Sequence, residues 1–281
     1  MQAPLTVRLG VLGWPVAHSR SPAMHNAALA HLGLHEWRYQ RLPVPPELFE
    51  ETVSALSQAG FRGANVTIPH KRAALELAGD ASPAARAIGA ANTLSFTPEG
   101  AIIAENTDAP GLLAALGRSP GGMSALVLGA GGSARAAVWA LREAGASEVL
   151  VWNRTPARAQ ALAHELGVRH VLAPCPAELL VNCTSVGLQG PAEAPAVIPS
   201  ASADEALNQL ALTFDQVGEY PNVVDLVYSS APTALLAAAK AHGARTVDGL
   251  EVLVKQGALS LELWTGRAAP EDVMRRAARD A

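Results

Sequence analysis

A glycine-rich turn near the middle of the chain has the spacing of a dinucleotide-binding loop. The apolar run Ala125–Leu128 is followed at once by Gly129-x-Gly131-x-x-Ala134 and then by helix-favouring residues. The first glycine permits a sharp bend, the second lets the backbone approach a pyrophosphate, and the small third residue lets the helix pack closely. An ordinary strand-to-helix turn can share this spacing. The strand expected at Glu148–Trp152 completes a βαβ unit, however, and favours a dinucleotide bound at the helix N-terminus.

The end of that second strand indicates which dinucleotide binds. An NAD site usually has Asp or Glu there, bonded to the 2′-hydroxyl of the ribose. This chain instead has Asn153-Arg154-Thr155, with Arg158 one turn further on. No carboxylate is present to repel a 2′-phosphate, and two guanidinium groups can pair with it or stack on adenine. The sequence therefore predicts NADP. The alternative is that both arginines are merely solvated on a surface helix.

Several polar residues of the first half stand at helix starts and strand ends, where they could contact a substrate. They are Ser19, Ser21, Thr67, Lys71, Asn92 and Asp108. Each also has an ordinary structural alternative. Ser21 is expected to be the N-cap of a helix that Pro22 opens, although the same helix start could hold a carboxylate. Lys71 could be solvated in a first helical turn, where the dipole disfavours its charge, and Asp108 could cap the next helix.

Alternating strands and helices must position these residues. In the first half, strands are expected at Val7–Gly13, Tyr39–Val44, Phe61–Ile68, Asn92–Phe96 and Ala101–Ala104, and helices at Ser21–Leu32, from Pro46, and at Pro69–Ala78, Pro83–Ile88 and Pro110–Leu116. After a linker at Gly117–Gly122, strands are expected at Ala125–Leu128, Glu148–Trp152, Leu179–Cys183, Val223–Val227 and Arg245–Val247, and helices at Ala134–Glu143, Pro232–His242, Gly249–Trp264 and Pro270–Ala278. This order predicts an α/β fold whose second half is a doubly wound parallel sheet. The segment Leu188–Tyr220 fits no clear pattern, apart from a helix expected at Asp204–Leu212.

Composition limits the class of protein. The 281 residues are enough for one large or two ordinary domains, and 49% hydrophobic with 16% charged residues is globular. A formal net charge of −4 gives no indication of a nucleic-acid partner. Two cysteines, Cys175 and Cys183, are expected to be reduced thiols of a cytoplasmic protein. No signal peptide, membrane span or metal-binding Cys/His cluster is recognised. The oligomeric state stays open, with a homodimer as one alternative.

Nine motifs resemble a known family when they are taken in order along the chain. They are Gly13-Trp-Pro-Val-Ala-His-Ser-Arg-Ser-Pro22, Gly63-Ala-Asn-Val-Thr-Ile-Pro-His-Lys71, Gly89-Ala-Ala-Asn-Thr-Leu94, Glu105-Asn-Thr-Asp108, Gly129-Ala-Gly-Gly132, Asn153-Arg-Thr155, Asn182-Cys-Thr-Ser-Val-Gly187, Asp225-Leu-Val-Tyr228 and Asp248-Gly-Leu-Glu-Val-Leu-Val-Lys-Gln256. This series resembles the signatures of the shikimate dehydrogenases. Some of the motifs are weak singly, but their order over nearly the whole chain is highly specific.

The resemblance implies NADPH-dependent reduction of 3-dehydroshikimate to shikimate, a step towards aromatic amino acids. It implies that Lys71 and Asp108 flank the reacting carbonyl and that Ser19 and Ser21 bind the substrate carboxylate. The substrate site would be completed by Thr67, Asn92, Tyr228 and Gln256. The cofactor would contact Gly129, Ala130, Gly131, Gly132, Ser133, Asn153, Arg154, Thr155 and Arg158, with Thr184, Leu226 and Gly249 near the nicotinamide. The implied domains are a substrate domain of residues 1–108 completed by 250–281 and a Rossmann NADP-binding domain of residues 109–249, with the reaction in the cleft between them.

The residues agree with this chemistry but leave alternatives open. An ammonium at Lys71 can stabilise the alkoxide that forms as a ketone is reduced and can donate its proton, while Asp108 bonds a substrate hydroxyl. The chain departs from the family at Glu251, where many members have glycine, and in a longer segment between Gly187 and Asp225. A quinate or dual quinate/shikimate dehydrogenase is a close alternative, because few pocket changes alter specificity. A non-catalytic NADP-binding regulator is a remote one.

Overall fold

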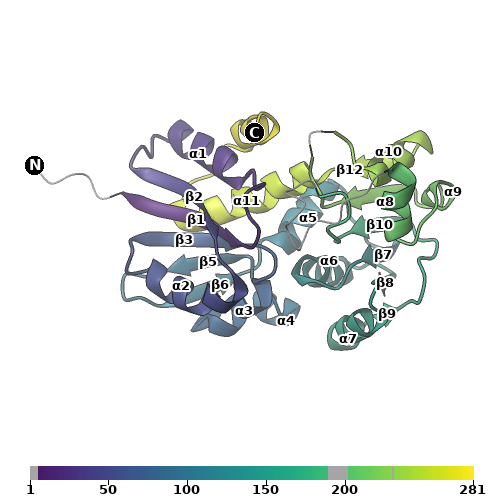
Figure 1. The fold of residues 1–281 in the computed structure, drawn as a ribbon, viewed down its shortest axis with the longest axis horizontal. Coiled ribbons are helices and arrows are strands. Elements are labelled where there is room, and N and C mark those ends of the chain that lie inside the picture. The colour runs from purple at the N-terminus through teal and green to yellow at the C-terminus, as the bar shows by residue number, and fades with distance from the viewer. Residues whose placement is uncertain (1–5, 189–201, 230) are drawn as a thin grey trace, which may run out of the picture. The chain divides into compact units, whose positions relative to one another are not determined.

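The computed structural model describes residues 6–188, 202–229 and 231–281 (Figure 1). The chain divides into two compact units, the first comprising residues up to Thr107 together with Val254–Ala281 and the second Asp108–Leu253. Compared with the expected domains, Asp108 and the first residues of the long helix after Val247 therefore belong to the second unit. Asp108 does so because it begins a helix of that unit.

The first unit is a mixed sheet between two layers of helices. Its strands are β1 (Val7–Gly13), β2 (Trp37–Pro43), β3 (Phe61–Val66), β4 (Asp80–Ala81), β5 (Thr93–Phe96) and β6 (Ile102–Glu105), in the order β2-β1-β3-β5-β6-β4. Its helices are α1 (Ser21–His31), the short 3₁₀ helix η1 (Pro46–Leu48), α2 (Phe49–Leu56), α3 (Lys71–Leu77), α4 (Pro83–Ile88), α12 (Glu271–Arg279) and the part of α11 (Gly249–Thr265) from Val254 onward. Strands β1, β2 and β3 run parallel, whereas β5 is antiparallel to both β3 and β6.

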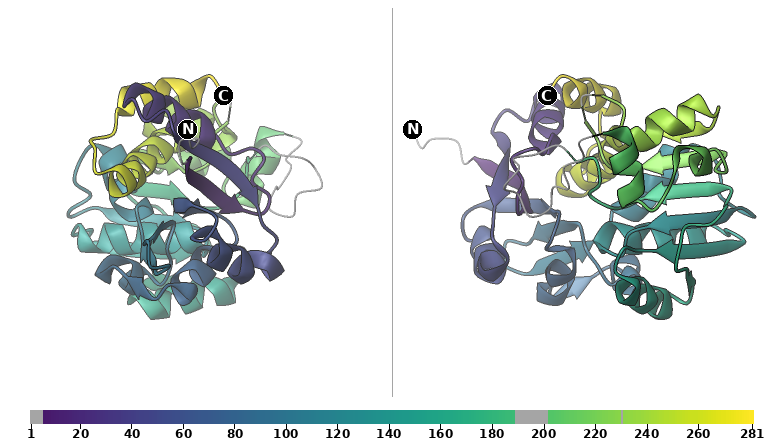
Figure 2. Two further views of the ribbon diagram at one scale, coloured as in Figure 1. Left: turned by 90° about the vertical axis from the view of Figure 1, so that its left-hand side faces the viewer. Right: turned by 45° about the vertical axis from the view of Figure 1, so that its right-hand side comes forward.

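Each face of this sheet is covered because its strands carry apolar residues on both sides. One face packs against α2, where Phe49, Val53 and Leu56 recur at helical spacing and are all buried. On the other face, Trp264 of α11 lies directly over Gly63 of β3 and donates its indole N–H to the carbonyl of Leu94, 3.0 Å away. A side chain at residue 63 would collide with that indole, so glycine is required there. Helix α12 lies beside α1 (Figures 1 and 2).

The second unit is a doubly wound parallel sheet, as the sequence predicts. Its strands are β7 (Ser124–Leu128), β8 (Glu148–Trp152), β9 (Arg169–His170), β10 (Leu179–Asn182), β11 (Asn222–Asp225) and β12 (Arg245–Val247), in the order β12-β11-β10-β7-β8-β9. Its helices are α5 (Asp108–Leu116), α6 (Gly132–Glu143), α7 (Pro156–Leu166), α8 (Ala203–Gln209), α9 (Phe214–Val217), α10 (Ala234–Ala241) and the start of α11. Counted from β7, the strand order is the 3-2-1-4-5-6 of dinucleotide-binding folds.

Successive residues of the β7–β12 strands face opposite helical layers. Leu126 and Leu128 pack with α8, α9 and α10, whereas Ala125 and Val127 pack with α5, α6 and α7. This alternation explains why these strands read as continuous apolar runs in the sequence. The α/β fold with a doubly wound second half is thereby confirmed.

Four local expectations need correction. Ser21 is not an N-cap: α1 begins at Ser21 itself, with Arg20 before it in helical conformation (φ −88°, ψ −4°), whereas an N-cap residue has extended dihedrals. Helix α3 begins at Lys71 instead of Pro69. Helix α5 begins at Asp108, two residues before the expected start at Pro110. The sequence pattern also missed β4, β9 and α9, which are only two to four residues long. Residues 189–201 of the unplaced segment lie outside the described residues.

Candidate functional site

Asn92 is the centre of a hydrogen-bond network in the first unit, here called the Asn92 hub, which includes one other predicted substrate residue, Gln256. Its side-chain N–H₂ donates to Oε1 of Gln256 on α11 at 3.1 Å and to Oγ1 of Thr107 at 2.9 Å. Its side-chain oxygen accepts the backbone N–H of Thr107 at 2.7 Å. Its backbone carbonyl accepts the N–H of Val66, next to Thr67, at 2.8 Å. The carboxamide is buried and its orientation is fixed from all of these directions.

A cluster of buried polar side chains is hydrogen-bonded to this network through Thr107. Ser260 of α11 bonds the hydroxyls of Thr93 and Thr107 at 3.0 and 3.1 Å and accepts the side-chain N–H of Asn65 at 2.8 Å. The other end of Asn65 accepts the phenolic hydroxyl of Tyr39 at 2.8 Å. Sequence reasoning gave these residues no role. Asn65 and Thr93 lie within the quoted motifs, but nothing near Ser260 in the sequence marks it as a partner of β3.

Lys71 begins α3 with its side chain buried, only 8% exposed. Its backbone carbonyl accepts the N–H of Ala91, next to Asn92, at 2.8 Å, so the lysine and the hub are tied through the main chain. The preceding residue, His70, anchors the turn. Its Nε2 lies 2.7 Å from the carbonyl of Val44, and its ring stacks on Phe49 at 4.4 Å. Burial lowers the pKa of His70, so the ring is neutral and donates its N–H to that carbonyl.

The two serines lie at the start of α1, as predicted, but with different structural roles from those expected. Both are buried. The hydroxyl of Ser19 accepts the backbone N–H of Ser21 at 3.3 Å. Ser19 therefore satisfies an N–H group at this helix start, which is the capping role that was expected of Ser21. The carbonyl of Ser19 accepts two N–H groups of Arg41 at 2.7 and 3.1 Å. The loop therefore combines helix N–H groups, two hydroxyls and a nearby guanidinium.

The glycine turn of the second unit has the form that phosphate binding requires. Gly129 has φ of +112°, and a side chain there would press on the backbone of Cys183. Gly131 has open space where a side chain would be, and it precedes α6 without any side-chain cap. The first N–H groups of α6 are therefore not used by a capping side chain and suit an anion. Gly132 and Ser133 form the first turn of the same helix, and Ala130 precedes them.

The residues after β8 lie where the adenosine end of a dinucleotide would bind. Asn153 donates its side-chain N–H to the carbonyl of Thr155 at 3.0 Å, which shapes the turn into α7. Arg154 and Arg158 are both exposed. Among the described residues neither forms an ion pair with a carboxylate. Both guanidinium groups are therefore available to a phosphate.

A second set of loops follows β10 and β11 at the same, carboxyl edge of the sheet. Thr184 donates its backbone N–H and its hydroxyl to the side-chain oxygen of Asn182, at 3.0 and 2.7 Å. The N–H of Leu226 bonds the carbonyl of Asn182 at 3.0 Å. Gly249, the first residue of α11, packs so closely on the carbonyl of Leu226 that any side chain would collide. Three predicted cofactor residues are thus held along one edge.

The two remaining predicted substrate residues, Asp108 and Tyr228, belong to the second unit. Asp108 opens α5, and Tyr228 follows β11. Glu251, where the chain departs from the family pattern, occupies the first turn of α11 and donates its backbone N–H to the carboxylate of Asp248 at 2.9 Å. A carboxylate in a first turn is favoured by the helix dipole, so Glu251 is accommodated locally.

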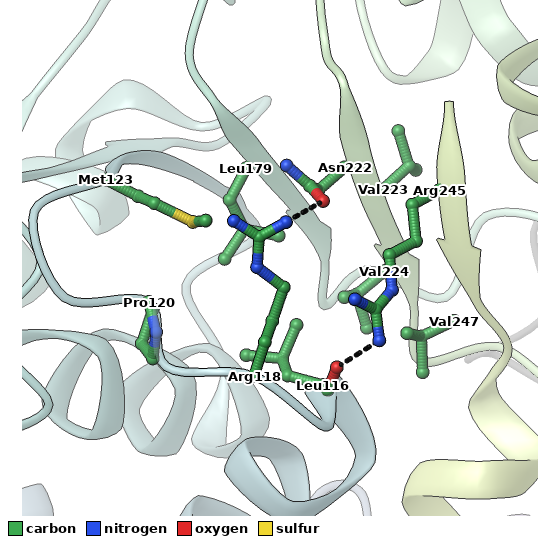
Figure 3. A pocket seen from close by; sticks show the side chains of 10 residues that line it. All are labelled: Leu116, Arg118, Pro120, Met123, Leu179, Asn222, Val223, Val224, Arg245 and Val247. Atoms are coloured by element: carbon green, nitrogen blue, oxygen red, sulfur yellow. Dashed lines mark hydrogen bonds between the residues drawn. The ribbon is translucent and has the colours of Figure 1, made fainter. Parts of the chain in front are cut away.

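A small pocket lies at the opposite, amino edge of the second sheet (Figure 3). Two arginines line it among mainly apolar side chains. Arg245 donates to the carbonyl of Leu116 at 2.9 Å, and Arg118 donates to the side chain of Asn222 at 3.3 Å. These bonds fasten the α5–β7 connection to the sheet. Ligands of open α/β sheets bind at the carboxyl edge instead, so the pocket is not the candidate site.

Within residues 6–188, 202–229 and 231–281, no cluster of three or more His, Cys, Asp or Glu side chains could hold a metal ion. In the same residues, no helix is long and apolar enough to cross a membrane. Neither Cys175 nor Cys183 forms a disulfide bond.

Comparison with known proteins agrees with the motifs. Residues 11–94 match the shikimate dehydrogenase substrate binding domain, residues 116–183 match shikimate / quinate 5-dehydrogenase, and residues 249–279 match the shikimate 5'-dehydrogenase C-terminal domain. A shikimate dehydrogenase (NADP(+)) of Thermus thermophilus is 47% identical over 279 residues, which cover 98% of each chain. That of Methylobacterium radiotolerans is 45% identical over 284 residues, covering 95% of each.

A solved structure has the same fold over nearly its whole length. It is the shikimate 5-dehydrogenase of Thermus thermophilus in complex with NADP(H) and shikimate, with a TM-score of 0.80 and 44% identity over 98% of this chain and 99% of that one. Its similarity covers both units of this chain. The chain therefore belongs to the shikimate dehydrogenase family.

Proposed function

We propose that this chain catalyses the reversible, NADP-dependent reduction of 3-dehydroshikimate to shikimate, in the biosynthesis of aromatic amino acids. The observation that carries the proposal is the coincidence of two features in one chain. In the first unit, the main chain of a buried lysine is bonded to Ala91, next to Asn92. In the second, a glycine turn is followed by Arg154 and Arg158, which form no ion pair with a carboxylate within the described residues. The relatives named as NADP-dependent shikimate dehydrogenases support it over nearly the full length of the chain.

The residues of the second unit fit NADP. The open space at Gly131 and the uncapped start of α6 suit a pyrophosphate, and the arginine pair suits the 2′-phosphate. We assign this unit, with expected bounds 109–249, to the cofactor, and the unit expected at 1–108 and 250–281 to the substrate. When bound, NADPH supplies the hydride, and the protein residues have to orient the substrate and move one proton.

Lys71 is proposed as the group that moves this proton. As the ketone is reduced its oxygen gains negative charge, and the lysine ammonium stabilises that charge and then donates the proton. In the oxidation of shikimate the same amine, uncharged, accepts the proton. Asp108 is proposed to accept a hydrogen bond from a substrate hydroxyl and to orient Lys71. The hydrogen bonds around Asn92 suit a site in which amide groups of Asn92 and Gln256 bind the other hydroxyls, together with Thr67 and Tyr228.

The arginine pair leads to a prediction about cofactor choice. Replacing both Arg154 and Arg158 with alanine should raise the KM for NADP by at least about tenfold, because a charge-assisted contact to phosphate is strong. The KM for NAD, which lacks the 2′-phosphate, should change by less than about twofold. Steady-state kinetics with each cofactor measures both, with Arg169→Ala, an exposed arginine paired with Glu148, as a control. Equal effects on NADP and NAD would remove the arginines from cofactor selection.

The serine pair leads to a second prediction, which follows from the observed hydrogen bonds. Ser21→Ala should raise the KM for shikimate by about tenfold, because a hydrogen bond to its carboxylate is lost. Since Ser21 is not an N-cap, the melting temperature should stay nearly unchanged. Ser19→Ala should raise the KM similarly but also lower thermal stability, because the acceptor for the Ser21 N–H disappears.

Kinetics and thermal melts of both serine variants measure this difference. A normal KM for shikimate in Ser21→Ala would show that this serine does not bind the carboxylate. A melting temperature lowered more in Ser21→Ala than in Ser19→Ala would instead restore Ser21 as the cap.

Quinate remains the alternative substrate within the same chemistry, as one of the matching family descriptions joins shikimate and quinate. Rates of oxidation of shikimate and of quinate by the purified chain, each with NADP, test the proposal. It predicts a kcat/KM for shikimate well above that for quinate. Comparable values would make the chain a dual enzyme, and no oxidation of either would favour a non-catalytic NADP-binding regulator. We place the reaction in the cytoplasm, which suits two cysteines that form no disulfide bond and NADPH chemistry.

A further inference from the structure

Asp225 is a fully buried carboxylate at the end of β11 that has no part in the proposed chemistry. One of its oxygens accepts the side-chain N–H of Asn182 at 2.9 Å and the backbone N–H of Val227 at 3.1 Å. Its other oxygen accepts the hydroxyl of Thr233 at 2.6 Å. A buried carboxylate is costly unless its oxygens are satisfied in this way. Burial raises its pKa to about 6, while these three hydrogen bonds oppose the rise.

Each of the three donors leads to a different segment at the carboxyl edge of the sheet. Asn182 holds Thr184 through its side-chain oxygen. The N–H of Val227 fixes the backbone on which Gly249 packs. Thr233 caps α10, accepting the N–H of Leu236 at 3.3 Å. One carboxylate therefore joins the β10 loop, the β11 loop and the start of α10.

The position of these segments in the fold indicates which part of the cofactor they contact. A doubly wound sheet of this order consists of two mononucleotide-binding halves. The glycine turn and the β8 end, with Arg154 and Arg158, lie in the first half, while β10, β11 and β12 form the second. If the first half reads the adenosine 2′-phosphate, then the loops joined by Asp225 lie on the nicotinamide side.

We propose that Asp225 is a positioning residue for the nicotinamide end of NADP, acting through Thr184, Leu226 and Gly249. The inference rests on the proposed use of NADP. By accepting hydrogen bonds from three segments at once, the carboxylate fixes their relative positions before the cofactor arrives, so that binding does not have to order them. An amide at this position has one acceptor oxygen where the carboxylate has two and carries no charge, so the hydrogen bonds to the three segments are weakened.

Binding of whole NADP and of one fragment separates positioning from general stability. The fragment is adenosine 2′,5′-bisphosphate, which contains the 2′-phosphate but no nicotinamide. Titration calorimetry of the full chain is made with each ligand. In Asp225→Asn, the Kd for NADP should rise about tenfold, while the Kd for the fragment should stay within about twofold of the wild type. Equal rises for both ligands would mean that the variant loosens the whole unit, and no rise for either would mean that Asp225 positions nothing. Both results overturn the inference.

A second variant covers the case in which Asp225→Asn does not fold, as judged by circular dichroism. Thr233→Val removes only the 2.6 Å hydroxyl bond and the α10 cap, and should raise the Kd for NADP alone, while Thr233→Ser should restore it. Thr213→Val is the matched control, because Thr213 caps α9 in the same unit by the same kind of bond. If Thr213→Val weakened NADP as much as Thr233→Val, the loss of a cap would explain the effect and the inference would fail.

The wild-type titration distinguishes this inference from the proposed function. A wild-type chain that binds no NADP would overturn both. A wild-type chain that binds NADP but oxidises neither shikimate nor quinate would overturn the proposed function alone, and the two variant comparisons would still decide the role of Asp225.

Discussion

Lys71→Ala should lower the turnover number for shikimate oxidation by about 10²- to 10⁴-fold, the usual contribution of a well-placed acid–base group. The KM for shikimate should change little, because the lost interaction belongs mainly to the transition state. Lys71→Arg should not restore the rate, since a guanidinium group cannot give up its proton near neutral pH. Steady-state kinetics of the purified variants, with circular dichroism to confirm folding, measures these effects.

The control for this prediction is Lys240→Ala, which removes an exposed lysine on α10 and should leave turnover unchanged. A Lys71→Ala variant with near-normal turnover would show that Lys71 does not move the proton. Asp108 would then be the next candidate. The structure argues against a mere surface role for Lys71, because its side chain is buried at a helix start, where the dipole disfavours a cation.

The second large effect concerns acid stability of the first unit. His25 of α1 is completely buried, with its ring stacked on Tyr39 at 4.2 Å and neither ring nitrogen hydrogen-bonded. Burial lowers its pKa to about 3 from 6.5. In the unfolded chain, His25 therefore binds a proton below pH 6.5, whereas in the folded chain it does not bind one until the pH falls to about 3. The contribution of the neutral ring to stability is full above pH 6.5 and is lost as the pH falls through this window.

His25→Phe should remove this part of the pH dependence. Between about pH 7 and pH 4 the free energy of unfolding should fall by about 3 kcal/mol less in the variant than in the wild type. His31→Phe, at an exposed histidine of the same helix, is the matched control and should behave like the wild type. Urea unfolding at several pH values measures the differences. Parallel pH profiles for His25→Phe and the wild type would mean that this ring titrates normally in the folded chain.

Much of the fold could be predicted because its signals are local. The strand Val7–Gly13 and the helix Pro83–Ile88 have the expected bounds, since apolar runs and a Ser-Pro helix start specify them. Ser82, for which no role was predicted, is the N-cap of that helix and accepts the N–H of Ala85 at 3.1 Å. The same Ser-Pro pattern failed at Ser21, because Ser19 accepts the free N–H and Arg20 is already helical. Two identical dipeptides thus differ only in their context.

The residues of the candidate site could be predicted from the sequence, but the hydrogen bonds between them could not. The motifs supplied Lys71, Asn92 and Gln256, yet no local pattern indicates that Ser260 bonds Asn65, 195 residues away. That bond exists because α11 returns to pack on β3. The role of Asp225 was missed for the same reason, since its partners Asn182 and Thr233 meet only after three segments have assembled. Polar networks of this kind depend on tertiary packing, which a periodic pattern does not contain.

The proposed function is tested most directly by mixing the purified chain with shikimate and NADP and following the formation of reduced nicotinamide by absorbance. Rapid, shikimate-dependent reduction of NADP is expected. The kcat/KM should be much lower when NAD replaces NADP, and the Lys71→Ala variant should have almost no rate under the same conditions. A chain that binds NADP but does not reduce it in the presence of shikimate, or one that uses NAD equally well, would contradict the proposed function.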